Sequence, residues 1–301
     1  MKQLSLHVTD TCNSKCGFCV VGSPLAQKDA VHYPDLVRFL FENAEQGYTS
    51  VNFHGGEPTI HPKLFELLNL ARLFGYPEVH IQTNGRKLKD SEFVRKLQEG
   101  GVRLFIVSLH GFHAETQDML AQVRGGFEET LEGIRNAKRL GIPVRTNTVL
   151  TKQNLYELDQ LVGLCGELDV DHVNISNLHP VGSGFFAIDG MGPAMAETRE
   201  VLLPAVERLL AMNRRVSLEG FPFCVVRPYQ HLSIEWEKRD IRMMYHGSVY
   251  DNYDTYMDQE CRTYGPACQQ CSCRGLCGGV YKEYAERRGW SEFAPLPAAS
   301  R

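Results

Sequence analysis

Three cysteines lie in the stretch Cys12-Asn13-Ser14-Lys15-Cys16-Gly17-Phe18-Cys19, at the spacing C-x3-C-x2-C. The stretch directly follows the first strand-like run, residues 4–9, so we expect it to form a loop at a strand end. Three thiolates bound to a 4Fe-4S cube leave one iron without a protein ligand, free to bind a small molecule. The alternative is a zinc knuckle, although zinc sites usually pair C-x2-C units with a fourth Cys or His nearby.

A glycine-rich turn, Gly55-Gly56-Glu57-Pro58, follows the next strand-like run. Glycines let a backbone approach a ligand closely, and carbonyl and carboxylate oxygens accept hydrogen bonds from an ammonium group. Taken alone, the segment could be an ordinary turn before a helix that Pro58 opens. Together with the cysteine loop and the aromatic Phe18, it resembles the radical S-adenosylmethionine (SAM) superfamily.

The resemblance implies that Cys12, Cys16 and Cys19 hold a 4Fe-4S cluster whose open iron binds SAM. It also implies reductive cleavage of SAM to a 5'-deoxyadenosyl radical, with the electron supplied by a flavodoxin or ferredoxin. Members of the superfamily contact SAM at positions that in this chain are Phe18, Gly55, Gly56, Glu57, Pro58, Thr83, Ser108, Arg145, Asn147, Pro180 and Val181.

The length, composition and net charge limit the classes of protein to which the chain can belong. The chain has 301 residues, 43% of them hydrophobic, which is enough for a full-sized core. A net charge of -4 without a basic block argues against nucleic acid as a partner. We see no secretory segment and no apolar run long enough for a bilayer, so we expect a cytoplasmic protein without membrane attachment.

Apolar periodicity switches between strand and helix from residue 4 to about residue 178. It predicts strands near 4–9, 50–54, 78–83, 102–109, 143–150 and 172–178, and helices near 34–46, 62–74, 90–99, 127–140 and 154–166. Such alternation requires a parallel α/β sheet but does not separate a Rossmann fold from a barrel. The resemblance favours a partial (β/α)6 TIM-like barrel with its site at the carboxyl ends of the strands.

Polar residues occupy every second position in several of these strands, where a fully buried parallel sheet would be nearly all apolar. We interpret them as the lining of a lumen that holds cofactor and a hydrophilic substrate. The pairs are His7 with Thr9, Asn52 with His54, Ser108 with His110, Arg145 with Asn147, and Asn174 with Ser176.

A second set of cysteines lies near the C-terminus, where Cys268, Cys271 and Cys277 have the spacing C-x2-C-x5-C. The run resembles the twitch or SPASM extensions that hold an auxiliary 4Fe-4S cluster, and zinc is the alternative metal. We expect Cys224 to complete the set. Cys261 and Cys273 are then spare, and either could replace Cys224 or donate a hydrogen atom to a substrate radical.

These observations predict a barrel over residues 1–215 and an auxiliary-cluster extension over residues 216–301. We see no winged peptide-binding domain before the first strand, which favours a small polar substrate of sugar or aminoglycoside type, epimerised or dehydrogenated. One alternative is a maturase that acts on a precursor peptide. An alternative of another class is an iron-sulfur or zinc scaffold, or an electron carrier, without catalysis.

Overall fold

The computed structural model describes residues 2–22 and 31–297. Nine strands form the main sheet in the order β7-β6-β5-β4-β3-β2-β1-β8-β9. They are β1 (Lys2–Thr9), β2 (Ser50–Gly55), β3 (Val79–Thr83), β4 (Val102–Ser108), β5 (Val144–Val149), β6 (His172–Ser176), β7 (Arg215–Glu219), β8 (Asp240–Tyr245) and β9 (Ser248–Tyr250). All neighbours pair in parallel except β8 and β9, which form an antiparallel hairpin.

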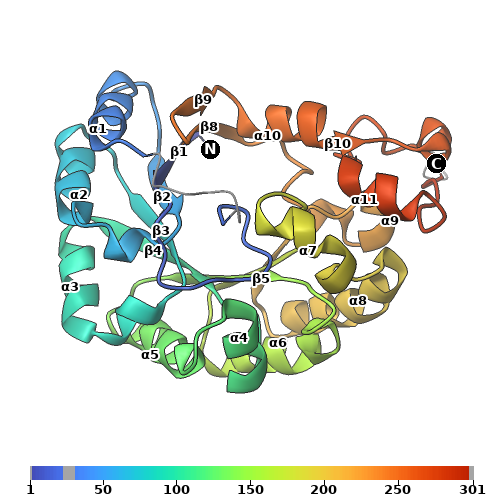
Figure 1. Ribbon diagram of the computed structural model, residues 1–301, viewed down its shortest axis with the longest axis horizontal. Coiled ribbons are helices and arrows are strands. Elements are labelled where there is room, and N and C mark those ends of the chain that lie inside the picture. The colour runs from blue at the N-terminus through green and yellow to red at the C-terminus, as the bar shows by residue number, and fades with distance from the viewer. Residues whose placement is uncertain (1, 23–30, 298–301) are drawn as a thin grey trace.

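The sheet curves into an open barrel, with helices covering its outer face (Figure 1). Those helices are α1 (Tyr33–Glu42), α2 (Leu64–Leu73), α3 (Ser91–Glu99), α4 (Ala114–Ala121), α5 (Gly126–Arg139), α6 (Leu158–Glu167) and α8 (Met195–Ala211). Strands β7 and β8 are not paired with each other, so the barrel does not close. The predicted α/β class with a partial parallel barrel is confirmed.

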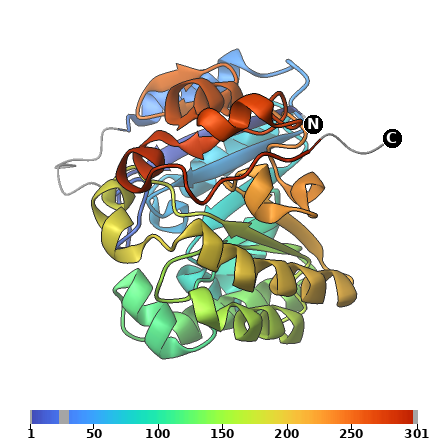
Figure 2. The same cartoon turned by 90° about the vertical axis from the view of Figure 1, so that its right-hand side faces the viewer.

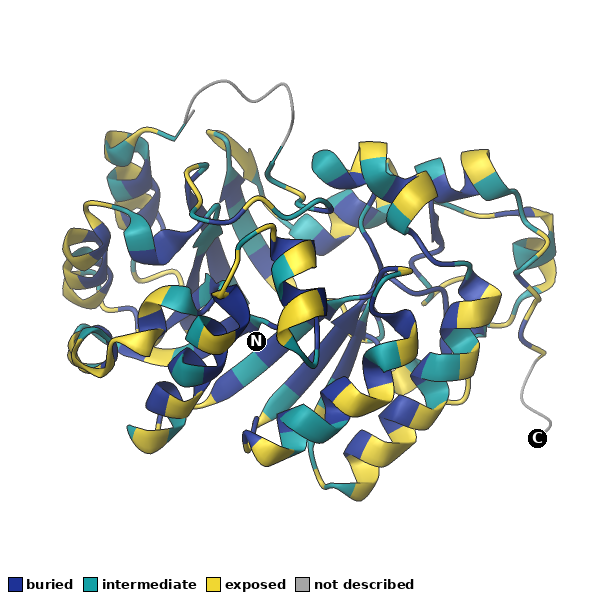
Figure 3. Ribbon diagram, turned by 60° about the horizontal axis from the view of Figure 1, so that its bottom comes forward, coloured by how far each residue is buried: buried dark blue, intermediate teal, exposed yellow. Residues whose placement is uncertain are grey.

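Strand β1 shows how the sequence divides the two faces of the sheet. Leu4 and Leu6 have no exposed surface and belong to the core beneath the helices, while Ser5 and His7 alternate with them. Figure 3 shows the same division for the whole barrel, with buried strands inside and the exposed residues on the outer sides of the helices.

The C-terminal third lies along one side of the barrel (Figures 1 and 2). It contains α9 (Phe223–Val226), α10 (Tyr253–Tyr256), β10 (Arg262–Thr263), β11 (Val280–Tyr281) and α11 (Lys282–Arg288). Another helix, α7 (Ser183–Met191), lies earlier in the chain, between β6 and α8. The boundary expected between residues 215 and 216 stays a prediction, and strands β7, β8 and β9 extend the main sheet up to and past it. No helix in the described part of the chain is both long and apolar enough to span a membrane.

Candidate functional site

The cysteine loop begins where β1 ends, and neighbouring elements hold its backbone. Asn84 Nδ2, just after β3, donates to Asn13 Oδ1 at 2.7 Å, and Arg86 Nη1 donates to the Asn13 carbonyl at 2.5 Å. The Lys15 amide donates to the Ala121 carbonyl at the end of α4, at 3.0 Å. The loop is therefore fixed from two sides of the barrel mouth.

The glycine-rich turn at the end of β2 packs directly on the start of this loop. The Gly56 amide donates to the Thr9 carbonyl at 2.6 Å, and the Glu57 amide donates to the Thr11 carbonyl at 2.9 Å. Gly55 has a φ of 135°, and a Cβ there would lie 2.4 Å from the Thr9 carbonyl oxygen. Because only glycine permits this contact, the turn and the cysteine loop form one unit.

Glu57 lies fully buried beneath the turn, and its carboxylate is saturated by protein donors. Oε1 accepts from the Thr59 amide at 3.0 Å, the Thr59 hydroxyl at 2.6 Å and the Thr83 hydroxyl at 2.7 Å, while Oε2 accepts from the Asn84 amide at 2.7 Å. Glu57 thus ties the end of β2 to the end of β3. The side chains of Glu57 and Thr83 are therefore engaged inside the protein.

The three thiols Cys12, Cys16 and Cys19 are free of disulfides. Burial, with the charges of Glu57 and Cys19, raises the pKa of Cys12 to about 11. Burial, with the charges of Cys19 and Cys12, raises the pKa of Cys16 to about 12. The sulfurs therefore repel one another electrostatically as thiolates, and a bound cationic cluster relieves that repulsion.

The opposite wall of the loop is formed by the segment after β6. The Ser183 amide donates to the Cys19 carbonyl at 2.8 Å, and a Cβ on Gly182 would lie 2.4 Å from the Val20 carbonyl oxygen. Pro180 and Val181, two of the predicted SAM contacts, therefore lie close to the cysteine loop.

Phe18 is buried and meets the ring of His110 edge-on, with centroids 4.9 Å apart. Ser108 pairs in register with Asn147 on the adjacent strand. The structure thus gathers the predicted SAM contacts around one barrel mouth, with Arg145 deeper on β5. Their roles toward SAM stay predictions.

Inside the lumen, a chain of hydrogen bonds links β5, β6 and β7. Asn174 Nδ2 donates to Asn147 Oδ1 at 2.5 Å and to Glu219 Oε2 at 3.0 Å, and the Ser217 hydroxyl donates to Asn174 Oδ1 at 2.5 Å. Burial alone raises the pKa of Glu219, but the neighbouring His179, Arg239 and Arg145 outweigh it and hold that pKa below its ordinary value. The predicted polar lumen thus contains an ionised carboxylate.

A cavity lies where the lumen meets the C-terminal third. Its walls include Glu219, His179, Glu235, Tyr253 and Met257. Its three cations are paired with its remaining carboxylates: Arg239 with Asp254 at 2.6 Å, Arg262 with Glu235 at 2.7 Å, and Lys238 with Asp258. By contrast, no basic nitrogen of the described residues lies within ion-pair distance of Glu219. The sequence does not indicate this cavity, because it predicts neither β7 nor the loop after it.

A second cavity brings four of the C-terminal cysteines together. Cys224, Cys268, Cys271 and Cys277 all line it, whereas Cys261 and Cys273 do not. Backbone amides point at two of the sulfurs: Gly279 N lies 3.3 Å from Cys277 Sγ, and Leu296 N lies 3.3 Å from Cys271 Sγ. Amide donors of this kind stabilise thiolate ligands.

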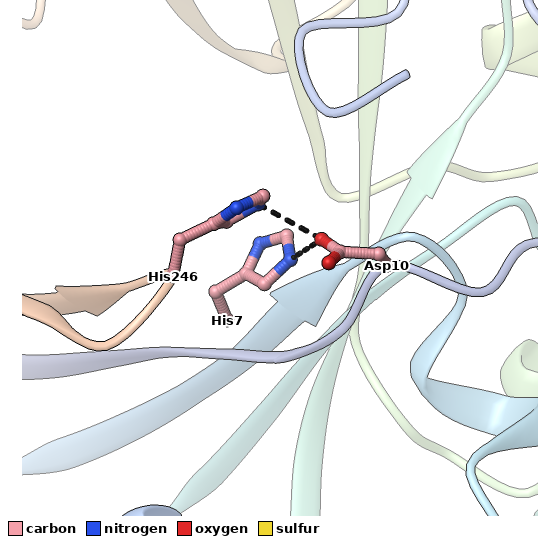
Figure 4. A group of neighbouring side chains, drawn as sticks. All are labelled: His7, Asp10 and His246. Carbon is pink, nitrogen blue, oxygen red and sulfur yellow. Dashed lines mark hydrogen bonds and ion pairs between the residues drawn. The ribbon is translucent and has the colours of Figure 1, made fainter. Parts of the chain in front are cut away.

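A cluster that the sequence did not reveal lies at the carboxyl end of β1 (Figure 4). His7 Nε2 is 2.7 Å from Asp10 Oδ1, and His246 Nε2 is 2.8 Å from the same oxygen. His246 comes from the turn between β8 and β9, some 236 residues away in the chain from Asp10, and the parallel pairing of β8 with β1 brings them together.

Comparison with known proteins agrees with this geometry. The profile of the Radical SAM superfamily matches residues 6–165, more than half of the chain. Proteins named "Probable GTP 3',8-cyclase" are similar: that of Saccharolobus islandicus is 31% identical over 188 residues, 62% of this chain and 60% of its own. That of Saccharolobus solfataricus is 30% identical over 236 residues, 76% of this chain and 75% of its own. The chain thus spans only about 60% of the length of the first relative.

Solved structures share the fold. Streptococcus suis SuiB bound to S-adenosylmethionine superposes with a TM-score of 0.71 at 18% identity, covering 99% of this chain and 76% of SuiB. Native anSMEcpe with bound AdoMet superposes with a TM-score of 0.66 at 15% identity, covering 98% of this chain and 93% of that one. The chain therefore belongs to the radical SAM superfamily, whose cofactors are a 4Fe-4S cluster and SAM.

Proposed function

We propose that this enzyme holds its cluster through Cys12, Cys16 and Cys19, binds SAM against the turn Gly55 to Pro58, and acts on a small polar substrate in the lumen. The observation that carries the proposal is the close contact of Gly55 with the Thr9 carbonyl. It presents the backbone of the turn beside three free thiols, in a place where any Cβ would obstruct the approach.

The spacing of the thiols supports an iron-sulfur cluster over zinc. Sulfurs around a tetrahedral zinc ion lie about 3.8 Å apart, because each Zn–S bond is about 2.3 Å. Among the described residues, neither cysteine set brings three sulfurs within 4.8 Å of one another. Ligands of a 4Fe-4S cube bind different irons and so stand farther apart.

When bound, the cluster and SAM supply reductive cleavage to methionine and a 5'-deoxyadenosyl radical that abstracts a hydrogen atom from the substrate. The protein positions these groups and shields them from water. Asn84 and Arg86 fix the cysteine loop, Glu57 locks the turn, and Phe18 with the segment after β6 closes the far wall. An electron donor of flavodoxin or ferredoxin type completes the scheme.

The charge of the first cavity supports a substrate without a polyphosphate. Its lysine and arginines already form ion pairs, so the described residues that line this cavity leave no cation unpaired for a triphosphate. Glu219 instead presents an ionised carboxylate with a single side-chain donor, which suits a hydroxyl or ammonium group. This favours a sugar-like or amine-bearing substrate over GTP, the substrate in the name of the similar cyclases.

We further propose that Cys224, Cys268, Cys271 and Cys277 hold an auxiliary 4Fe-4S cluster, which supports the division into a barrel and an extension. Cys261 and Cys273 stay outside that cavity and are the candidates to return a hydrogen atom to a substrate radical. If a thiol does so, the outcome is epimerisation. If the auxiliary cluster accepts the electron, the outcome is dehydrogenation.

The test is formation of 5'-deoxyadenosine by the anaerobically reconstituted enzyme with dithionite. We expect sugars or amino sugars to stimulate it and precursor peptides not to; stimulation by a peptide alone would indicate a maturase. Cys16→Ala should abolish product, while Cys165→Ala, in the helical core away from both cysteine sets, is the matched control. Product from Cys16→Ala at the wild-type rate would refute the proposal, and iron binding without any product would favour a carrier.

A further inference from the structure

A compact group of metal-binding side chains lies beside the cysteine loop but contains no cysteine. The ligand atoms of His7, Asp10 and His246 all lie within 4.8 Å of one another. In the described part of the chain, no other three His, Cys, Asp or Glu ligands come so close together. We propose that this triad binds one divalent transition-metal cation, separate from both cysteine sets.

The donor set fits such a cation. Two imidazole nitrogens and one carboxylate oxygen suit zinc, iron(II) or manganese, and three protein ligands leave coordination positions open. Both imidazoles point at the same carboxylate oxygen in Figure 4. With metal bonds of about 2.1 Å, the ligand atoms would stand about 3.4 Å apart, so the observed 2.7 and 2.8 Å contacts need only a small outward movement.

The backbone at His246 is a second and independent observation. The two-residue turn between β8 and β9 is His246-Gly247, with φ of 49° and 77°. Turns with both central residues left-handed favour Asn-Gly, and any residue other than glycine is uncommon in that region. Here the left-handed backbone directs the imidazole of His246 onto Asp10.

A neighbouring imidazole supplies the third observation. His54 Nε2 is buried and has no hydrogen-bond partner, and its ring lies 5.6 Å from that of His7. An imidazole nitrogen without a hydrogen-bond partner therefore lies beside the triad.

The position of the triad beside the turn at Gly55 gives the bound cation a functional role. A Cβ on Gly55 would lie 3.3 Å from His7 Cε1, which places the triad against the proposed SAM turn. Its open coordination positions could hold a hydroxyl or carboxylate oxygen of the substrate near the reacting centre. This role depends on the proposed function, whereas the binding of the cation does not.

The experiment measures the zinc and iron content of the reconstituted holoenzyme. Wild type, His246→Asn and His231→Asn are dialysed together against zinc chloride, and zinc and iron are measured in the same samples by mass spectrometry. Asparagine is favoured in the left-handed turn and so keeps the hairpin, while the exposed His231 is the matched control. Any zinc on spare cysteines is common to all three proteins and cancels in the difference.

We expect wild type and His231→Asn to bind about one zinc equivalent more than His246→Asn, with equal iron in all three. Equal zinc in wild type and His246→Asn would overturn the proposal. Anomalous scattering at the zinc edge from wild-type crystals is the second measurement, because it needs no variant. A peak between His7, Asp10 and His246 supports the site, and zinc peaks only elsewhere refute it.

Discussion

Gly56 and Thr11 are in contact so close that no other residue can replace the glycine: a Cβ on Gly56 would lie 2.3 Å from the Thr11 carbonyl oxygen. The same Cβ would lie 2.6 Å from the Asp10 carbonyl oxygen. Both oxygens belong to backbone just before Cys12, so a side chain at residue 56 must push the cysteine loop away.

Gly56→Ala should therefore lose cluster iron and at least about tenfold in 5'-deoxyadenosine formation, because one ångström of misplacement in a positioned site has that scale of effect. Gly190→Ala is the control, since a Cβ there meets nothing within 4 Å. Iron analysis and product assay check both variants. Normal iron and product from Gly56→Ala would contradict the close contact.

Glu57→Gln tests the buried link between β2 and β3. The amide keeps the shape but turns an NH2 group toward protein donors, which leaves buried hydrogen bonds unmade. We expect the free energy of unfolding to fall by about 1–3 kcal/mol. Urea denaturation measures it, and an unchanged midpoint would show that the four contacts contribute little.

The auxiliary site predicts different effects for two cysteines. Cys224→Ala should lose about four irons per chain, one cluster's worth, while Cys261→Ala keeps them, because only Cys224 lines the cavity with the other three cysteines. Iron and acid-labile sulfide are measured together. Loss of a cluster from Cys261→Ala instead would mean that the ligand set includes that residue.

Glu219→Gln tests the substrate cavity. Removing the one carboxylate there without an ion pair should weaken binding of an amine-bearing or hydroxyl-rich substrate, and raise its KM at least about tenfold, as expected for a charge-assisted hydrogen bond. The readout is substrate-stimulated 5'-deoxyadenosine. A KM equal to that of wild type would show that Glu219 does not bind the substrate.

His172 predicts part of the pH dependence of stability. Burial, then the charges of Arg145 and Arg215, lowers the pKa of His172 to about 3 in the folded protein. The unfolded chain keeps the ordinary value of about 6.5 and binds the proton first, so stability falls as the pH drops below 6.5.

Between pH 7.5 and 5.5 this group should lower the free energy of unfolding of the wild type by about 1.4 kcal/mol, and His172→Gln should not show that decrease. Urea unfolding of both proteins at the two pH values measures the difference. Identical pH dependence of the two proteins would show that His172 titrates normally when folded.

Local patterns predicted much of the barrel. The alternation along β1 depends only on neighbouring residues: Leu4 and Leu6 are buried core residues, with Ser5 and His7 between them. The predicted helix near 90–99 also begins on a local contact, because Asp90 Oδ1 accepts from the Glu92 amide at 3.0 Å. Helix α4, between Ala114 and Ala121, was not predicted, since its apolar face is weak.

The pairing of strands that are distant in the chain could not be predicted from the sequence. The parallel pairing of β8 with β1 brings His246 to Asp10. The sequence around β8 does not show that this strand pairs with β1, which is far away in the chain. For the same reason Glu219, at the end of the unpredicted β7, was not recognised as a lumen residue.

The most direct test of the central claim is the balance of products from SAM. The anaerobically reconstituted enzyme is mixed with SAM and dithionite, and 5'-deoxyadenosine and methionine are quantified together with cluster iron. We expect equal amounts of both products from wild type and neither from Cys16→Ala. A wild-type protein that carries its full iron and sulfide, binds SAM and yields no 5'-deoxyadenosine would contradict it.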